Sequence, residues 1–432
     1  MTAFAWTFGL EEEFFLVDPR TRALCADVPA SLLHACRRRV GDAVTPELLR
    51  SQIEIVSPVF HDHDQAVVEM AALRRGVAEV AGEKDLRVVA AGTHPIANWA
   101  GQVETRKSRY RRLVRDFQIV GRRNVLCGLH VHVAVPEGVD RVALMNRVMP
   151  WLPAFLALST SSPFWNREPT GLYSYRQAAY DEWPRTGIPD PFADEGEYAE
   201  FVRRLVAGGA AADASMLWWA IRPALRYPTL ELRICDACTR LDDALAIAAL
   251  YRCLVRALVR TPAPVAARAP FERRLIDENR WRAKRFGLDA TFLALDGGEP
   301  VACRDAIARL LADVEEDARA LRAEPALARV RAILAEGTSA HAQLALYQAR
   351  CARGDAPIAA LRFVVDWLAA ATYGPVDRER NAVDAPPRAE LPASLRYPGI
   401  GATTFATASE ASNRRNARIR GSASASRRIA NA

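Results

Sequence analysis

The sequence has 432 residues, 50% of them hydrophobic and 25% charged, which is the composition of a globular protein rather than of a disordered or fibrous one. Six arginines between Ala411 and Ala432 supply most of the net charge of +7, so the rest of the chain is nearly neutral and no nucleic-acid partner is expected. No apolar run is long enough to span a membrane and the N-terminus does not resemble a secretory signal, so we expect a cytoplasmic protein without a membrane partner.

Hydrophobic periodicity divides the chain into a first part with strands and a second part with helices. The alternating or apolar patterns predict strands over 7–17, 51–58, 86–92, 127–136 and 227–235, with helices over 62–84, 110–123 and 140–149. Residues 240–372 are almost wholly helical in pattern, which favours an α+β fold. We therefore predict one folded domain over residues 1–375, followed by a disordered tail over 376–432 that is rich in Pro, Ala, Ser and Arg.

The first strand carries three consecutive glutamates. Because alternate residues of a strand share a face, Glu11 and Glu13 point to one side, whereas Glu12 points to the other with Leu10 and Phe14. Adjacent carboxylates repel one another, and a divalent cation would compensate for this repulsion if the strand is buried. The alternative is a solvated strand at the edge of a sheet.

Two further strands place polar residues opposite an apolar face. Ile53 and Ile55 predict a core face for the second strand, which leaves Glu54 on the other side. His130 and His132 likewise share one face of their strand, where both can meet one metal ion or one anion. A structural role is the usual alternative for a single histidine. Because carboxylates dominate the candidate ligands, Mg²⁺ or Mn²⁺ fits better than zinc.

The last of these strands pairs a carboxylate with a guanidinium. Glu231 and Arg233 share one face, and Leu232 points to the other. This arrangement suits a site that holds both a cation and phosphate oxygens, although a simple ion pair is the alternative. Arg222 and Arg226 add positive charge upstream. If only a metal ion holds Glu231 in place, a glutamine at this position is expected to stabilise the metal-free protein slightly.

Together these strands predict a sheet with one face on the core and one face lined by acids, histidines and arginine, as in an open active-site trough. The chain has no Walker A sequence, no dinucleotide-binding glycine motif and no Gly-x-Ser-x-Gly elbow. Its eight cysteines are scattered, so buried free thiols are expected, including Cys235 and Cys238.

Seven motifs occur in an order that resembles a known family. They are Phe8-Gly-Leu-Glu-Glu-Glu-Phe, Ser51-Gln-Ile-Glu-Ile, Gly92-Thr-His-Pro, Cys127-Gly-Leu-His-Val-His-Val, Ser159-Thr-Ser-Ser-Pro-Phe-Trp, Thr170-Gly-Leu-Tyr-Ser-Tyr-Arg and Thr229-Leu-Glu-Leu-Arg-Ile. Over residues 4–373 the chain resembles the YbdK-type carboxylate–amine ligases, the glutamate–cysteine ligase type 2 family. Arg167 departs from the family, many of whose members have glycine there.

The resemblance implies a curved, mainly antiparallel sheet that forms an open funnel with helices outside, as in glutamine synthetase and the glutamate–cysteine ligases. It also implies roles for the residues on the polar faces. Matching the motifs assigns metal binding to Glu11, Glu13, Glu54, His130 and Glu231, and a position near the nucleotide phosphates to Arg233. We add Arg222 and Arg226 as candidate nucleotide-binding residues, and His130, His132 and Arg233 as candidate catalytic residues.

The implied activity is the ATP- and Mg²⁺-dependent ligation of a glutamate-type carboxylate to an amine, with cysteine as the acceptor that gives the family its name. An acyl phosphate would be the intermediate, and a homodimer is plausible by resemblance. Two alternatives stay open, a metal-dependent amide hydrolase and a non-catalytic protein that binds a metal or an amino acid. Dependence on ATP distinguishes the first, and amine-dependent ADP release distinguishes the second.

Overall fold

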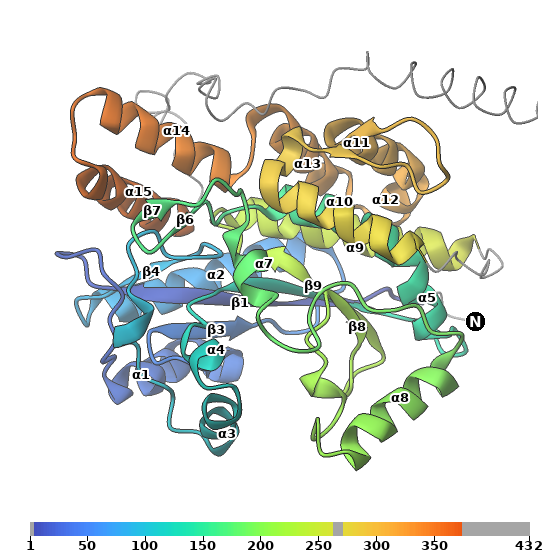
Figure 1. Ribbon diagram of the computed structural model, residues 1–432, viewed down its shortest axis with the longest axis horizontal. Coiled ribbons are helices and arrows are strands. Elements are labelled where there is room, and N and C mark those ends of the chain that lie inside the picture. The colour runs from blue at the N-terminus through green and yellow to red at the C-terminus, as the bar shows by residue number, and fades with distance from the viewer. Residues whose placement is uncertain (1–3, 262–270, 374–432) are drawn as a thin grey trace, which may run out of the picture. The chain divides into compact units, whose positions relative to one another are not determined.

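All five strands predicted from the sequence belong to one sheet in the computed structural model, which describes residues 4–261 and 271–373. Within these residues the sheet has seven strands in the order β2-β3-β1-β5-β9-β8, with β4 paired to the end of β1 (Figure 1). Every pairing is antiparallel, which confirms the predicted α+β fold with an open antiparallel sheet. The strands are β1 Phe8–Val17, β2 Val44–Pro46, β3 Gln52–Val56, β4 Arg87–Val89, β5 Gly128–Ala134, β8 Ile221–Pro223 and β9 Thr229–Asp236.

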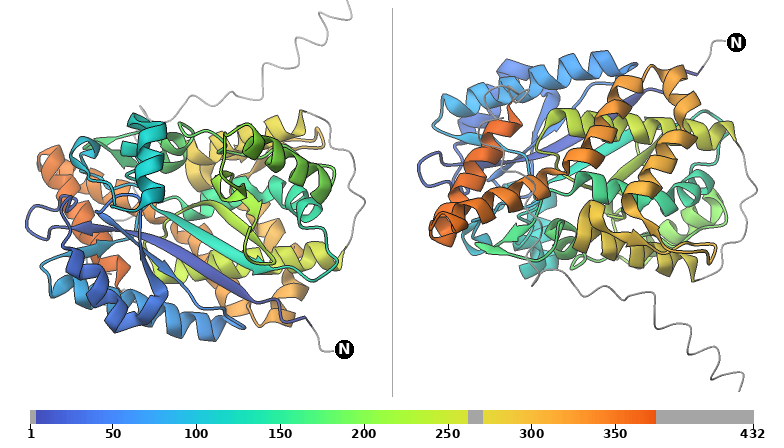
Figure 2. Two further views of the ribbon diagram at one scale, coloured as in Figure 1. Left: turned by 90° about the horizontal axis from the view of Figure 1, so that it is seen from below. Right: turned by 90° about the horizontal axis from the view of Figure 1, so that it is seen from above.

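One face of the sheet is apolar and lies on the main hydrophobic core. Leu10, Val131 and Leu232 point into this core, as their strand periods predict, and each is at most 1% exposed. Helices α2 (His63–Gly82), α6 (Leu152–Ser159) and α9 (Leu241–Arg260) pack in the same core. The two views of Figure 2 show the strands open to view from one side and the helices of the second half lying over them on the other.

The remaining helices surround this central layer. The predicted helical second half is confirmed for the described residues, apart from a small hairpin of β10 (Thr291–Phe292) and β11 (Val301–Ala302). The other helices are α1 Ala30–Val40, α3 Ser108–Phe117, α4 Ile119–Arg122, α5 Arg141–Val148, α7 Tyr175–Tyr180, α8 Glu195–Ala207, α10 Glu272–Phe286, α11 Cys303–Asp313, α12 Glu315–Leu321, α13 Glu324–Glu336, α14 Ser339–Ala352 and α15 Pro357–Thr372.

By length and composition, the helical stretch Arg141–Ser159 is apolar enough to cross a membrane. However, 78% of its most apolar window is buried inside the protein, and every residue of α6 is buried. Its apolar character is therefore explained by packing in the core.

The predicted helix over 110–123 is interrupted at Gln118, whose φ of 49° ends α3 and precedes the single turn of α4. The predicted helix over 62–84 is confirmed as α2. Asp62 caps it by accepting a hydrogen bond of 2.8 Å from the backbone N–H of Gln65. Asp140 caps α5 in the same way.

The glutamate on the apolar face, Glu12, has its own counterion. Arg74 of α2 donates to both carboxylate oxygens, at 2.5 and 2.9 Å, and both side chains are almost fully buried. The Arg74 guanidinium also donates to the backbone carbonyls of Cys238 and Thr239 at 3.0 Å. The charge of Glu12 is thus compensated within the protein, and this residue ties β1 to α2 rather than contributing to a metal site.

Arg167 stands at a turn that favours glycine. Asn166 and Arg167 join β6 (Phe164–Trp165) to β7 (Glu168–Pro169) with φ values of 50° and 72°. Two residues of positive φ in a two-residue hairpin connection define a type I′ turn, for which Asn-Gly is the preferred sequence. The backbone therefore explains why glycine suits position 167, and arginine there is strained.

The predicted disordered tail over 376–432 lies outside the described residues. The eight cysteines are all described and all free, and six of them are buried, as the sequence predicted. Cys235 and Cys238 are among the buried thiols and form no disulfide.

Candidate functional site

The strand registers bring the predicted polar residues together in rows across the other face of the sheet. Glu11 of β1 lies opposite His130 of β5, and Glu13 lies opposite Glu54 of β3. His132 of β5 lies opposite Glu231 of β9. Because β3, β1, β5 and β9 are consecutive in the sheet, the four polar faces that the sequence predicted separately form one continuous surface.

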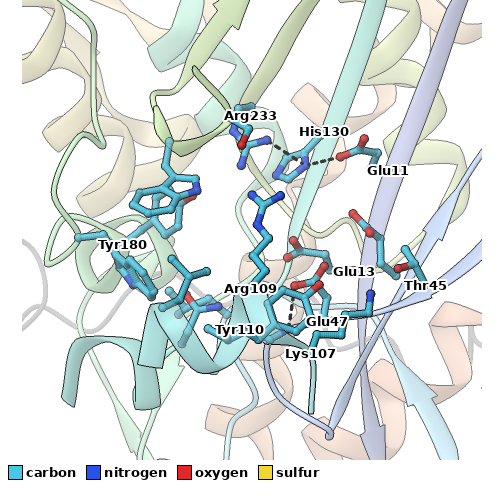
Figure 3. A pocket seen from close by; sticks show the side chains of 18 of the residues that line it. Glu11, Glu13, Thr45, Glu47, Lys107, Arg109, Tyr110, His130, Tyr180 and Arg233 are labelled. Atoms are coloured by element: carbon cyan, nitrogen blue, oxygen red, sulfur yellow. Dashed lines mark hydrogen bonds and ion pairs between the residues drawn. The ribbon is translucent and has the colours of Figure 1, made fainter. Parts of the chain in front are cut away.

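A cavity of about 540 Å³ lies over this surface (Figure 3). Seven of the nine predicted site residues line it, and His132 and Glu231 do not. The seven are Glu11, Glu13, Glu54, His130, Arg222, Arg226 and Arg233. The cavity wall also contains residues that the sequence analysis did not assign to the site, chiefly Glu47, Lys107, Arg109, Tyr110, Arg176, Tyr180, Trp183 and Trp218.

Glu13, Glu47 and Glu54 form what we call the acidic cluster. One carboxylate oxygen from each lies within 4.8 Å of the others, and no ion pair to any of them is formed by the part of the chain that the structure describes. Burial and the neighbouring Glu13 raise the pKa of Glu47 to about 8. Burial and Glu47 raise the pKa of Glu54 well above its ordinary value. These raised pKa values indicate that the protein by itself does not compensate full ionisation of the cluster.

Sequence reasoning missed Glu47 because it lies outside any strand. It lies in the short connection between β2 and β3, directly after β2. The alternation of side chains along a strand therefore does not assign it to a face. Only its charge, close before a strand already suspected of binding a cation, could have drawn attention to it. Its backbone neighbour Pro46 accepts a hydrogen bond of 2.9 Å from the Tyr110 hydroxyl, which joins this connection to α3.

The other end of the surface, which we call the paired cluster, consists of Glu11, His130, His132, Glu231, Arg222 and Arg233. The Glu11 carboxylate lies 3.0 Å from Nδ1 of His130 and 3.4 Å from Nε2 of His132. Although burial opposes it, the hydrogen bonds to the two histidines hold the pKa of Glu11 well below its ordinary value. Burial and the Arg233 guanidinium lower the pKa of His130, which favours the neutral imidazole, the form that binds a cation.

Glu231 is held between two arginines. Arg222 donates from Nε to one carboxylate oxygen at 2.7 Å, and Arg233 donates to the other. These guanidinium groups outweigh the effect of burial and lower the pKa of Glu231 to about 2. The expectation that only a metal ion holds Glu231 against repulsion is therefore wrong, because two cations of the protein already compensate its charge.

The same contacts change the interpretation of Arg222. Besides its bonds to Glu231, its Nη1 donates to the carbonyls of Ser215 and Leu217, each at 2.9 Å. Its donors are thus used by the protein, which favours a role in positioning Glu231 over the predicted role in binding nucleotide phosphates. Arg233, by contrast, retains a buried Nε without a partner among the described residues. Arg226 is exposed on the connection between β8 and β9, at the cavity wall.

A shift of register between β5 and β9 places Arg233 beside His130. Leu129 lies opposite Cys235, but Val131 lies opposite Leu232, so the strands differ by one residue around His130. Arg233 Nη1 approaches Nδ1 of His130 to 3.5 Å across this irregularity. Irregularities of this kind re-aim side chains at functional sites.

Two glycines of the sequence motifs leave space that a neighbouring side chain fills. A β-carbon at Gly128 would lie 2.3 Å from Nη2 of Arg176, and one at Gly92 would lie 2.7 Å from Cγ of Asp236. The backbone N–H of Gly128 also donates to Glu13 at 2.6 Å. Gly128 therefore allows both a buried arginine and a glutamate of the acidic cluster to approach the start of β5.

The donor groups of both clusters fit divalent cations. Within the described residues, three groups offer ligand atoms within 4.8 Å of one another. They are Glu11–Glu54–His130, Glu11–His132–Glu231 and Glu13–Glu47–Glu54. Carboxylate oxygens dominate all three, and Mg²⁺ and Mn²⁺ prefer such ligands. Glu11 and Glu54 each belong to two groups, so neighbouring cations could share them.

Residues 7–361 match the family described as glutamate–cysteine ligase family 2. A protein of Ectopseudomonas mendocina named "Putative glutamate–cysteine ligase 2" is 46% identical over 375 residues, which are 85% of this chain and 97% of that protein. A protein of the same name from Rhodospirillum rubrum is 45% identical over 382 residues, 88% of this chain and 98% of its own.

Solved structures of low sequence identity share the fold. The glutamate–cysteine ligase of Francisella tularensis, solved in complex with AMP, aligns with a TM-score of 0.63 at 14% identity and covers 90% of both chains. The bifunctional glutathione synthetase of Pasteurella multocida aligns with a TM-score of 0.64 at 13% identity. That alignment covers 85% of this chain but only 53% of the larger protein.

Proposed function

Because the chain belongs to glutamate–cysteine ligase family 2, we propose that it is an ATP-dependent carboxylate–amine ligase that joins the side-chain carboxylate of glutamate to an amine. The observation that carries the proposal is the continuous polar face of the sheet. Two of its three groups of glutamate and histidine ligands lie wholly at one cavity that arginines also line, and the third group shares Glu11 with one of them. This arrangement suits a reaction in which several anions must be held close together.

The reaction needs activation because a carboxylate is a poor electrophile. In the proposed first step, a carboxylate oxygen attacks the γ-phosphorus of ATP, the bond to the bridging oxygen breaks, and ADP and an acyl phosphate form. The amine nitrogen then attacks the acyl carbon, the bond to the phosphate oxygen breaks, and the nitrogen loses a proton as the amide forms. Such phosphoryl transfer depends mainly on positioning and on neutralising charge.

We assign Glu11, Glu13, Glu54, His130 and Glu231 to metal binding and add Glu47. The donor set fits Mg²⁺ or Mn²⁺, since carboxylates predominate and the acidic cluster lacks a counterion in the described residues. When bound, these ions would neutralise phosphate charge and orient its oxygens. Arg222 keeps the Glu231 carboxylate in its place on the sheet.

Arg233 and His130 would act on the transferring oxygens, and His132 would support them. Arg233 lines the cavity and contacts Glu231 and His130 through Nη1 only, so the rest of its guanidinium can meet an anion there. His130 lies at the cavity wall between Glu11 and Arg233, where it can ligate a cation or donate to an oxygen, depending on its tautomer. His132 does not line the cavity and hydrogen-bonds to Thr229 at 3.0 Å, which favours a supporting role.

Nucleotide binding is supported by the AMP complex of the Francisella enzyme, and cysteine as acceptor by the names of the family and its members. The products would then be γ-glutamylcysteine, ADP and phosphate. The homodimer and the cytoplasmic location also stay predictions.

The deciding experiment measures ADP release from ATP with Mg²⁺, glutamate and a panel of amines that includes cysteine. Release that requires both glutamate and an amine, with formation of the amide, supports the ligase. Amide hydrolysis that proceeds without ATP would establish the hydrolase instead. Ligand binding without amine-dependent ADP release would indicate a non-catalytic binding protein.

A further inference from the structure

The cationic side chains at the cavity differ in whether they already form hydrogen bonds or ion pairs with other groups of the protein. Arg222 is bound by Glu231 and two carbonyls, and Arg176 donates to the carbonyl of Cys235 at 3.0 Å. Arg233 is paired with Glu231. Arg109, in the first turn of α3, also lines the cavity but has no hydrogen bond or ion pair among the described residues. Its guanidinium thus has no hydrogen-bonded partner in the described part of the chain, although, after the hydrogen bonds from Ser215, its charge helps to lower the pKa of Asp213, with which it also lines a smaller cavity.

Figure 3 shows how Arg109 lies in the cavity. In this view its side chain extends from α3 into the space framed by the labelled residues Glu13, His130 and Arg233. Glu11, Glu13, Glu47 and Glu54 line the same cavity, yet Arg109 forms no ion pair with any of them among the described residues. Arg109 instead points to the space between the acidic cluster and Arg233, where a bound anion would contact both.

The start of α3 adds to the positive potential at this position. No side chain caps the helix, so its first backbone N–H groups lack a side-chain acceptor. The partial positive charge of a helix N-terminus therefore adds to the charges of Lys107 and Arg109, which both line the cavity. The opposite wall of the cavity carries Arg233, so an anion between them would face cations from two sides.

We propose that Arg109 binds a substrate oxyanion in the cavity, and so is a substrate-binding residue that the sequence motifs do not identify. This inference rests on the proposed ligase function. Two oxyanions have the required chemistry, the phosphoryl group of the nucleotide and the carboxylate of the amino acid. The position of Arg109 between the acidic cluster and Arg233 favours the phosphoryl group, because that group would contact the cations bound by the glutamates as well.

Arginine is common on α3, so the position and not the residue type carries the argument. Arg111 lies two residues further along the same helix, is exposed, and does not line the cavity. It therefore provides a matched control, since Arg111→Gln removes the same charge from the same helix. A long-range electrostatic effect of α3 would appear in both variants, whereas direct binding would appear only in Arg109→Gln.

The experiment measures binding of ADP, inorganic phosphate and glutamate by calorimetry in the presence of Mg²⁺, for the wild type, Arg109→Gln and Arg111→Gln. We expect Arg109→Gln to weaken binding of ADP or phosphate by about tenfold or more, the usual loss for a hydrogen bond to a charged group. Arg111→Gln should bind as the wild type does. A loss confined to glutamate would identify the amino-acid carboxylate as the bound oxyanion.

Two further measurements make the result decisive. Thermal unfolding shows whether Arg109→Gln is folded, and Arg109→Lys should recover part of the lost affinity because it restores the charge without the planar fork. Wild-type affinity of Arg109→Gln for all three probes would overturn the proposal. Because binding is measured without turnover, wild-type protein that binds ADP but ligates no carboxylate to any amine would refute the proposed function while leaving the role of Arg109 tested.

Discussion

The two ends of the polar face compensate their carboxylates by different means. In the paired cluster, histidines and two arginines compensate Glu11 and Glu231, and the pKa values of both carboxylates are lowered. In the acidic cluster, burial and mutual repulsion raise the pKa values of Glu47 and Glu54. The same residue type therefore stabilises the metal-free fold at one end of the sheet and destabilises it at the other.

The difference indicates that the paired cluster and the acidic cluster have different roles. The paired cluster is organised before any ligand binds, which preserves the geometry around His130 and Arg233. The acidic cluster is completed only by a cation, so it should account for most of the change in stability when metal binds. The predictions below test this division, beginning with the largest expected effect.

Removing divalent cations should abolish catalysis. With a chelator in excess, ADP release that depends on glutamate and amine should fall to background, because nothing in the described protein replaces a cation at the acidic cluster. Adding Mg²⁺ or Mn²⁺ should restore it. Full activity in metal-free buffer would contradict the assignment of both clusters.

Glu231→Gln should destabilise the metal-free protein. The substitution leaves the nearly buried Arg222 and Arg233 without a counterion, and breaking a buried pair in this way costs about 3–5 kcal/mol. Turnover should also fall by about 100-fold, as expected for losing one electrostatic stabiliser of a transition state. Thermal unfolding and ADP release measure the two effects.

Leu232→Ala is the neighbouring control on the apolar face. Leu232 is fully buried, so its truncation should cost about 2–5 kcal/mol, while turnover of the folded protein should change little. A metal-free Glu231→Gln protein as stable as the wild type would show that the arginines do not depend on this carboxylate, and the comparison between the clusters would fail.

Glu47→Gln should have the opposite effect from Glu231→Gln on the free energy of unfolding, because it should stabilise the metal-free protein. A carboxyl whose pKa is raised on folding opposes folding as it ionises. The stability therefore falls as pH rises from 4.5, its ordinary pKa, to about 8, its value in the fold. Glutamine removes this penalty, so the gain should be absent near pH 4.5 and grow to about 4–5 kcal/mol at pH 8, since each pKa unit corresponds to about 1.4 kcal/mol.

Saturating Mg²⁺ should make the wild type more stable than Glu47→Gln, the reverse of the order expected without metal. At saturating Mg²⁺ the wild type gains the free energy of metal binding, and Glu47→Gln, which lacks a ligand, should gain less. Unfolding measured across pH with and without Mg²⁺ tests both statements. A stability of Glu47→Gln that parallels the wild type at every pH would mean that the acidic cluster is solvated and not strained.

Arg167→Gly gives the smallest effect and a reference outside both clusters. Its φ of 72° favours glycine, so the substitution should stabilise the protein by up to about 1 kcal/mol. Because the gain comes from the backbone, it should be the same at every pH and independent of Mg²⁺. A gain that follows pH would mean that the arginine charge, and not its φ, sets the stability at this turn.

The sequence determined the faces of the strands. Period-two alternation depends only on local geometry, so the outward direction of Glu11, Glu13, Glu54, His130 and Glu231 could be predicted residue by residue. The same alternation placed Glu12 on the opposite face from Glu11 and Glu13. Its partner Arg74 lies 62 residues away in the chain and could not be predicted from the strand. The ordered motifs predicted the family, and the chain's match to it bears this out.

Only the tertiary structure decided which of these residues meet. The strand order sets β3 beside β1 and β5 beside β9, and the register shift at Arg233 brings it to His130. Glu47 and Arg109 enter the cavity from segments without strand period, so no local pattern could assign them. The sequence gives the charge of each group, but compensation depends on distances of a few ångströms between distant segments, and these are set by the packing of the whole sheet.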